Sequence, residues 1–116
     1  MKQQYLRRMV VFENHFKDFK KTLDRNTLKK LYQVFILIMT MRIVPAKFLK
    51  AIEGKKGLYE IRIEHDSNIY RVFCCFDEEN LIVLLNGFQK KSQRLPTEQI
   101  EKADYLMKKY YDQKNK

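Results

Sequence analysis

Two arginines and one glutamate occur at a spacing that would bring them together on a β-sheet. The segments Leu58–Glu64 and Ile69–Phe76 each alternate apolar and polar residues with a period of two, and four polar residues separate them. A hairpin closed by a four-residue turn would place Arg62 opposite Arg71, with Glu60 diagonal to Arg71. Because like charges directly opposite one another destabilise a sheet by up to about 1 kcal/mol, this pair indicates a bound anion. The alternative is that Glu60 simply neutralises the two arginines.

The same register separates the two faces of the predicted sheet. One face would be apolar and would form the core, with Tyr59, Ile61, Ile63, Tyr70, Val72 and Cys74. The charged residues would lie on the opposite face together with Phe73, Ile82 and Leu84, and with Asn86 if the second turn also has four residues. Arg71 is therefore expected to lie outside the core.

Two further segments complete the predicted sheet. The polar residues 77–80 precede Leu81–Leu85, an apolar run with the length and branching of a buried strand, so that three strands form an antiparallel meander. Arg7–Phe12 is assigned to a first strand. The adjacent Cys74 and Cys75 would point to opposite faces, which argues against a disulfide or a chelating pair and in favour of two small buried side chains.

Helical patterns come before and after the meander. Asn14 is a suitable N-cap for a first helix, whose apolar stripe consists of Phe12, Phe16, Phe19 and Leu23. A longer helix follows over Thr27–Ile43, with a stripe formed by Leu28, Leu31, Phe35 and Ile38. Its part Val34–Met39 is apolar all round. By composition alone this part could be a strand, but its continuity with the preceding turns favours a helix that is deeply buried or covered by a partner.

The remaining segments are a linker and a last helix. Pro45 ends the second helix, and residues 46–57 are expected to be a basic linker with one helical turn. Pro96 stands where helices favour proline, and a buried stripe then recurs at Ile100, Ala103, Leu106 or Met107, and Tyr110. The tail Asp112–Lys116 should fray. Together these elements predict one α+β domain over residues 1–116, in which two N-terminal helices and a C-terminal helix accompany a small antiparallel sheet.

Charge and hydropathy restrict the partners of this domain. The 116 residues carry a formal net charge of +10, and the isoelectric point is about 9.6, so a polyanion such as nucleic acid, or an acidic protein, is the expected partner. The first residues, Met1–Tyr5, do not resemble a signal peptide, so none is expected. The longest apolar run is far shorter than the roughly 20 residues that a membrane span requires. We therefore expect a cytoplasmic protein without a membrane partner.

Four short motifs resemble those of a known family. They are Gly-Leu-Tyr-Glu-Ile-Arg-Ile (57–63), Tyr-Arg-Val (70–72), Asn-Gly-Phe-Gln-Lys-Lys-Ser (86–92) and Leu-Pro-Thr-Glu-Gln-Ile-Glu-Lys-Ala (95–103). With the order of strand and helices, they resemble the RelE/HigB-type toxins of toxin–antitoxin pairs, and more narrowly the phage-derived HigB-like branch. The resemblance implies a RelE-like fold and a ribosome-dependent endoribonuclease that cuts messenger RNA in the ribosomal A site. It also implies a cognate antitoxin, often of the helix-turn-helix type.

The resemblance also implies site residues. The family's basic strand positions match Arg62 and Arg71, and its basic exit from the last strand matches Lys90 and Lys91. Attack by a ribose 2′-hydroxyl on the adjacent phosphate requires a base, an acid and positive charge on the phosphorane, which arginine supplies well. Glu60 replaces a lysine of the best-known RelE pattern. It could be the general base, or it could only orient Arg62 and Arg71.

Other basic residues would hold the RNA rather than cleave it. We expect the four cations of the site to line one shallow groove, and backbone phosphates to be contacted by Lys47, Lys50, Lys55, Lys56 and Arg94. His15 and His65 have no Cys or His at ligand spacing, so a solvated role is the simpler interpretation and no metal site is expected. No small-molecule cofactor is expected either.

Two other functions remain open from the sequence. The first is that of the ParE-like branch, which acts on DNA gyrase and needs no groups for phosphate cleavage. The second is that of a non-catalytic module that binds nucleic acid or an antitoxin through its basic face. The cations favour the nuclease, whereas Glu60 and the absence of a recognisable catalytic histidine leave room for the other two.

Overall fold

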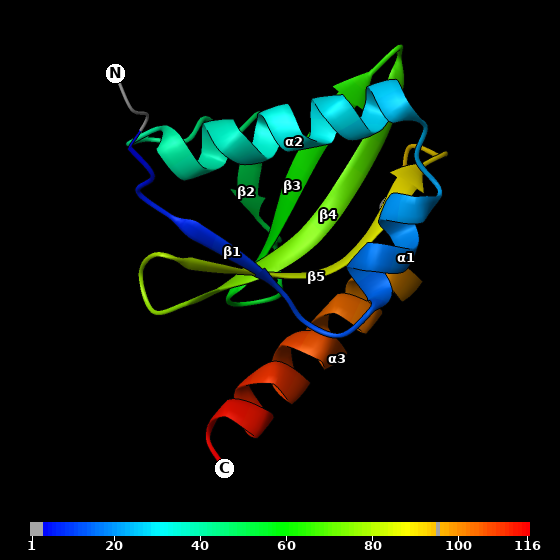
Figure 1. Ribbon diagram of the computed structural model, residues 1–116. Coiled ribbons are helices and arrows are strands. Elements are labelled where there is room, and N and C mark those ends of the chain that lie inside the picture. The colour runs from blue at the N-terminus through cyan, green and yellow to red at the C-terminus, as the bar shows by residue number, and fades with distance from the viewer. Residues whose placement is uncertain (1–3, 95) are drawn as a thin grey trace.

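The computed structural model describes residues 4–94 and 96–116 and shows an α+β domain built on one five-stranded sheet (Figure 1). In chain order the elements are β1 (Arg8–Val11), α1 (His15–Lys21), α2 (Arg25–Thr40), β2 (Leu49–Ala51), β3 (Leu58–His65), β4 (Asn68–Asp77), β5 (Leu81–Lys90) and α3 (Thr97–Lys114). The strand order across the sheet is β1-β5-β4-β3-β2. Helices α1 and α2 cover one face and α3 covers the other. The predicted fold class is confirmed.

The sheet is mixed, which corrects the expectation of a purely antiparallel sheet. Strand β1 pairs with β5 in parallel, with Met9 opposite Ile82 and Val11 opposite Leu84. The three strands of the predicted meander pair antiparallel, as expected. Strand β1 comes before both N-terminal helices, so the chain crosses over the sheet before it returns to β5, and a parallel pair needs such a long crossover.

The prediction of a basic linker over residues 46–57 is only partly confirmed. One helical turn is present, because the backbone N–H groups of Phe48 and Leu49 donate to the carbonyl of Pro45 at 2.9 and 3.2 Å. Strand β2, Leu49–Ala51, then forms the edge of the sheet beside β3, with Lys50 opposite Glu60. A strand of three residues is too short to show an alternation of apolar and polar side chains in the sequence. Its existence depends on the free edge of β3 that it covers.

Both ends of α2 are set by polar side chains. The carboxylate of Asp24 accepts a hydrogen bond from the backbone N–H of Thr27 at 2.7 Å, which starts the helix two residues before the predicted Thr27 and lowers the pKa of Asp24. At the other end, the Arg7 guanidinium donates to the carbonyls of Ile38 and Met41 at 3.0 and 2.7 Å. The helix therefore ends at Thr40 rather than at Ile43. No helix among residues 4–94 and 96–116 combines the length and apolar character needed to cross a membrane.

The register of the first hairpin is the predicted one. Arg62 lies opposite Arg71, and Glu60 lies opposite Phe73. The turn itself is tighter than predicted, because Asp66 and its neighbour adopt positive φ angles of 50° and 67°, as the two-residue turns of hairpins require. The flanking pair simply extends the ladder by one step, so the tighter turn leaves every facing pair unchanged.

The second turn changes the predicted register. Asp77 pairs with Leu81, so the connection has three residues rather than four, and Glu78 has a φ of 58°. This shift of one residue moves Ile82 and Leu84 to the face covered by α1 and α2, where both are buried, and corrects their predicted position. A second irregularity between Val72 and Cys74 then places Phe88, not Asn86, opposite Arg71.

Two apolar layers lie on the two faces of the sheet. The layer under α1 and α2 contains the predicted core residues Ile61, Ile63, Tyr70, Val72 and Cys74, with Tyr59 partly buried against them. The layer under α3 contains Leu58, Phe73, Cys75, Val83, Leu85, Ala103, Leu106 and Met107. Both cysteines are buried, on opposite faces as predicted, and burial raises the pKa of Cys75 to about 11. Neither thiol is suited to act as a nucleophile.

Helix α1 approaches β5 unusually closely at Gly87. A Cβ atom at this position would lie 2.5 Å from Cδ2 of Phe19, which is 8% exposed and part of the core. No ordinary contact is so short, so a side chain at residue 87 would push α1 away from the sheet. The glycine is therefore required by packing, not by its backbone angles.

We expect Gly87→Ala to lower the free energy of unfolding by about 1–3 kcal/mol, the usual cost of overpacking a core. Urea denaturation measures this cost. Gly54→Ala is not a suitable control, because Gly54 has a φ of +82° and a substitution there would strain the backbone. A double variant, Gly87→Ala with Phe19→Leu, should regain part of the loss. Unchanged stability in Gly87→Ala would show that α1 is free to shift.

Helix α3 continues to Lys114, beyond the predicted start of the frayed tail at Asp112. Asp77, 5% exposed at the end of β4, forms an ion pair with Lys114 and accepts a hydrogen bond from the Tyr110 hydroxyl. The Tyr111 hydroxyl donates to the carbonyl of Phe76. The Lys114 ammonium is the main cause of the lowered pKa of Asp77, and the Tyr110 hydroxyl is the next. The hydrogen bond to Asp77 in turn raises the pKa of Tyr110 to about 12. This clamp keeps the last turns helical.

The lowered pKa of Asp77 predicts a dependence of stability on pH. Its contribution is fully present above the unfolded-state pKa of about 4 and is lost as the pH falls through the lower folded-state pKa. Asp77→Asn should therefore be less stable than wild type at pH 7, with a smaller difference at pH 3. Urea denaturation at both values tests this. An equal difference at the two values would show that the carboxylate charge does not stabilise the docking of α3.

Candidate functional site

Glu60 and Arg71 form an ion pair that is buried between the sheet and α3. Nη1 of Arg71 lies 2.8 Å from Oε2 of Glu60, and the two residues are 9% and 2% exposed. Lys50, on β2, places its ammonium 3.9 Å from Oε1 of Glu60 at the edge of the sheet. The expectation that Arg71 lies outside the core was wrong, because α3 and its apolar layer cover this face. The pairing favours the interpretation that Glu60 neutralises Arg71.

A second polar side chain, Asn86, is buried on the same face. Its Nδ2 donates to the backbone carbonyl and to Oε1 of Gln99, on the first turn of α3, both at 3.2 Å. Among the described residues, Nε of Arg71 and Oδ1 of Asn86 have no hydrogen-bond partner, and the polar partner of Oε2 of Glu60 is the guanidinium of the ion pair. Each unsatisfied buried group costs about 1–3 kcal/mol, so this polar cluster is an expensive part of the core.

Arg62 lies opposite Arg71 in the ladder but has its own carboxylate. Its Nη1 donates to Oε2 of Glu64 at 3.1 Å, and its side chain is 29% exposed. It lines a small hollow with Lys47 and Phe48, next to α2. Because each arginine is already paired with a glutamate, the two do not by themselves require a bound anion.

Uncompensated positive charge lies where β5 ends. Lys90 and Lys91 line a hollow beside the β3–β4 turn, and the exposed Arg94 follows four residues after Lys90. In residues 4–94 and 96–116, these three cations take part in no ion pair. The predicted groove of four cations is thus divided: Arg71 is buried, Arg62 lines one hollow, and the lysines line another.

Lys91 also lines a second hollow, between α1, β5 and α3. The other polar side chains around it are those of His15, Asp18, Thr22, Asp24, Tyr70, Gln89, Gln99 and Lys102. His15, at the start of α1, has Nε2 3.4 Å from Oε1 of Glu13, a residue with a φ of 60°. An imidazole beside a carboxylate is a suitable group for proton transfer, and it shares this hollow with two ammonium groups. We name these residues, His15, Tyr70, Lys91 and Lys102, the α1–α3 hollow.

The residues of the α1–α3 hollow were mostly missed from the sequence. His15 has no ligand or catalytic motif near it in the chain, and Tyr70 was assigned to the core, where it is indeed 8% exposed. Only the packing of α1 against β5 brings His15 near the exit of that strand. Asn86 carried a usable signal, because it is an amide that interrupts an apolar run in a central strand.

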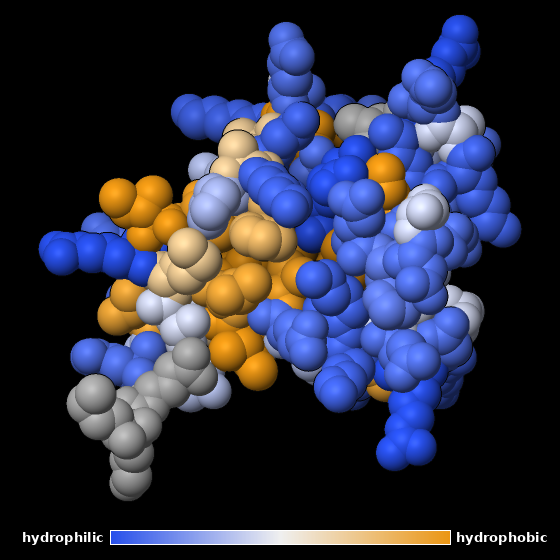
Figure 2. All heavy atoms as spheres, turned by 90° about the horizontal axis from the view of Figure 1, so that it is seen from above, coloured by the Kyte–Doolittle hydropathy of each residue, from blue (hydrophilic) through white to orange (hydrophobic). Residues whose placement is uncertain are grey.

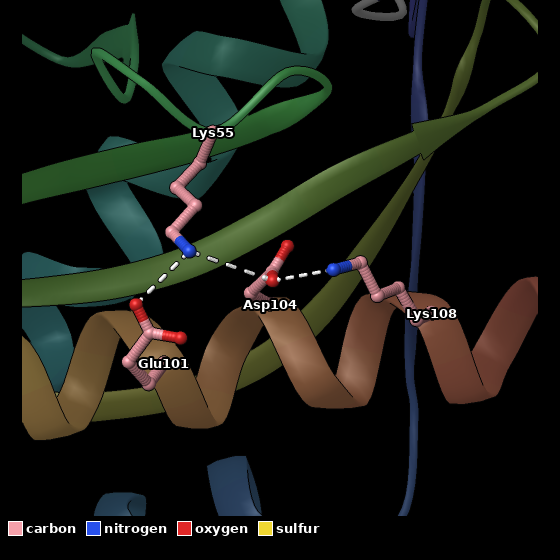
Figure 3. A network of polar contacts seen from close by, with 4 residues as sticks. All are labelled: Lys55, Glu101, Asp104 and Lys108. Atoms are coloured by element: carbon pink, nitrogen blue, oxygen red, sulfur yellow. Dashed lines mark hydrogen bonds and ion pairs between the residues drawn. The ribbon is translucent and has the colours of Figure 1, made fainter.

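The cations predicted to contact the RNA backbone lie in different surroundings. Lys47 and Lys50 are exposed, with the Lys47 ammonium 5.6 Å from the ring centre of Phe48, and Lys56 is exposed. Lys55 instead reaches across to α3, where its ammonium lies 2.9 Å from Glu101 and 3.6 Å from Asp104 (Figure 3). Its charge is already compensated, so it ties the loop after β2 to α3.

The network around Asp104 explains two pKa shifts. Lys108, one turn further along α3, lies 2.8 Å from Asp104 on the side away from Lys55 (Figure 3). Lys108 first, and Lys55 to a smaller extent, lower the pKa of Asp104, while Glu101 is the main cause of the raised pKa of Lys55. Lys55 is consequently the least suited of the predicted residues to bind phosphate.

Comparison with known protein families assigns the chain to one of them. Residues 17–108, most of the chain, match the phage-derived Gp49-like protein family (DUF891), and the protein belongs to this family. The family is commonly toxin-like, of the RelE/HigB type. No curated protein matches the sequence.

The buried pair predicts a large loss of stability on single substitution. Arg71→Ala should lower the free energy of unfolding by about 3–5 kcal/mol, because it leaves the Glu60 carboxylate buried without its partner. A double variant, Glu60→Leu with Arg71→Met, should be much closer to wild type, since an ion pair can be replaced by apolar side chains of similar volume. Urea denaturation measures both.

Arg62→Ala is the matched control, because this half-buried arginine pairs with the exposed Glu64 and should contribute less than about 1 kcal/mol. If Arg71→Ala proves as stable as Arg62→Ala, the Glu60–Arg71 pair does not hold this face of the sheet together.

Proposed function

We propose that the protein is the toxin of a toxin–antitoxin pair and acts in the cytoplasm as a ribosome-dependent endoribonuclease that cleaves messenger RNA in the A site. Membership of the Gp49-like family supports the toxin class. The net charge of +10 and the unpaired cations Lys90, Lys91 and Arg94 support a polyanionic substrate. The observation that carries the nuclease proposal is the α1–α3 hollow, where an imidazole, a phenol and two ammonium groups border one space together with the carboxylates of Asp18 and Asp24.

The groups of this hollow match the needs of RNA cleavage. One basic nitrogen takes the proton of the ribose 2′-hydroxyl as its oxygen attacks the adjacent phosphorus, and the bond from phosphorus to the 5′-oxygen breaks. A second group returns a proton to the departing 5′-oxygen, which leaves a 2′,3′-cyclic phosphate and a free 5′-hydroxyl. His15 is the proposed base. Lys91 and Lys102 neutralise the phosphorane, and either lysine can supply the proton.

The residues proposed from the family resemblance then have two roles. Lys90 holds the RNA backbone, together with Arg94 and the exposed lysines Lys47, Lys50 and Lys56, while Lys91 lies at the phosphate that is cleaved. Glu60, Arg62 and Arg71 support the strands that carry these cations. Burial of Glu60 behind Arg71 favours an orienting role over that of general base, since a base must reach the hydroxyl that it deprotonates. The proposed partner is a cognate antitoxin of the helix-turn-helix type.

We expect His15→Ala to cleave messenger RNA roughly 10²–10⁴ times more slowly than wild type, the usual loss when a general base is removed. Growth arrest should disappear with cleavage. Primer extension on messenger RNA from cells that express each variant measures the effect. His65→Ala, at the tip of the β3–β4 hairpin, is the matched control and should cleave like wild type.

Lys91→Ala should slow cleavage as well as weaken binding to RNA and reduce the dependence of binding on salt concentration, whereas Lys56→Ala should have a smaller effect. Full cleavage by His15→Ala would refute the α1–α3 hollow as the site. Growth arrest by wild type without new cleavage ends would refute the nuclease and favour the gyrase-directed alternative.

A further inference from the structure

The distribution of charge along the chain is uneven around α2. From Arg25 to Ile52 the sequence contains no aspartate and no glutamate. The same stretch carries six cationic residues, which are Arg25, Lys29, Lys30, Arg42, Lys47 and Lys50. The surface that α2 presents therefore has no carboxylates of its own to compensate its positive charge.

Large apolar side chains are exposed on the same surface. Tyr32, Ile36 and Leu37 of α2 are 41%, 37% and 38% exposed, and Ile43, just beyond the helix, is 82% exposed. Figure 2, which looks down on α2, shows apolar residues gathered in one patch with hydrophilic residues beside it. The chain before β1 borders this patch, because the backbone N–H of Leu6 donates to the carbonyl of Met39 at 2.7 Å. A contiguous exposed apolar patch of this kind marks an interaction site.

The shape of the surface fits a helix. Two rows of side chains run along α2 at a spacing of four residues: Arg25, Lys29 and Gln33 form one row, and Leu28, Tyr32 and Ile36 form the other. All six residues line one shallow hollow along the helix. A groove between such rows is what the side chains of a second helix fill when two helices pack. Lys20 of α1 donates to the Tyr32 hydroxyl at 2.9 Å and adds a further cation at the edge.

We propose that the outer face of α2 is the docking site for an acidic amphipathic helix of another protein, with apolar side chains of that helix on Tyr32, Ile36 and Leu37 and its carboxylates beside Arg25 and Lys29. The exposed apolar residues favour a protein over RNA, because phosphate contacts would explain the cations and not the isoleucine and leucine. Two copies of this surface would repel one another, which disfavours a dimer through this face. The inference rests on the proposed function only in naming the partner as the antitoxin.

Binding to the purified product of the neighbouring gene, measured by calorimetry, tests the proposal. Ile36→Glu and Leu37→Glu, made separately, should each weaken binding at least about 30-fold, the loss typical of a central interface residue. Tyr105→Glu is the matched control, since Tyr105 is 63% exposed on α3 and the change in charge is the same. Lys29→Glu, a fully surface substitution, should also weaken binding and guards against a folding defect in the other two.

Hydrogen exchange should show protection of residues 25–40 in the complex. Binding of Ile36→Glu, Leu37→Glu and Lys29→Glu with wild-type affinity would overturn the proposal, as would wild-type protein that does not bind this partner or that dimerises through this face. Toxicity separates the two proposals. If the docking site is correct, Ile36→Glu arrests growth even when the partner is co-expressed, whereas failure of wild type alone to arrest growth would refute the proposed function and not the docking site.

Discussion

The burial of one carboxylate and one guanidinium under α3 constrains the rest of the structure. The side chains of Glu60 and Arg71 are both buried, and neither could stay charged in the core without the other. Their contact requires the β3–β4 register in which Arg62 lies opposite Arg71, and it requires α3 to cover this face. Consequently the positive charge of Arg71 is used inside the molecule. The charge that a ligand can reach on this side of the molecule lies on the cations beyond this cover, at the exit of β5.

Local patterns were sufficient to predict the helices and the first hairpin. The apolar stripes of α1, α2 and α3 and the alternation in β3 and β4 each depend on residues close in sequence, and an extra ladder step at the turn does not change the pairs. The second turn could not be predicted in the same way. Asp77 is a typical turn residue, but it ends β4 because Lys114 and Tyr110, more than thirty residues later, satisfy its carboxylate. The face on which Ile82 and Leu84 lie follows from that tertiary contact.

The candidate site was less predictable than the fold, for a related reason. Residue type and the family resemblance identified Lys90 and Lys91 as site cations, which are at least partly exposed, and they also identified Arg71, which is buried. A sequence states that a residue is charged but not which helix covers it. His15 enters the α1–α3 hollow only because Gly87 allows α1 to approach β5, and no spacing along the chain records this approach.

The acidic residues explain why the molecule has two distinct cationic surfaces. Glu60, Glu64, Asp77, Glu101 and Asp104 all pair with cations of this chain, so they compensate charge on β3, β4 and α3. The excess is left on α2, where apolar side chains accompany it, and at the exit of β5, where polar and proton-transfer groups accompany it. Salt screens exposed charges but does not weaken the burial of apolar surface. Under the two proposals, a partner helix on α2 would stay bound at an ionic strength that already weakens phosphate contacts at the other surface, so the protein would hold the proposed antitoxin firmly and RNA only transiently.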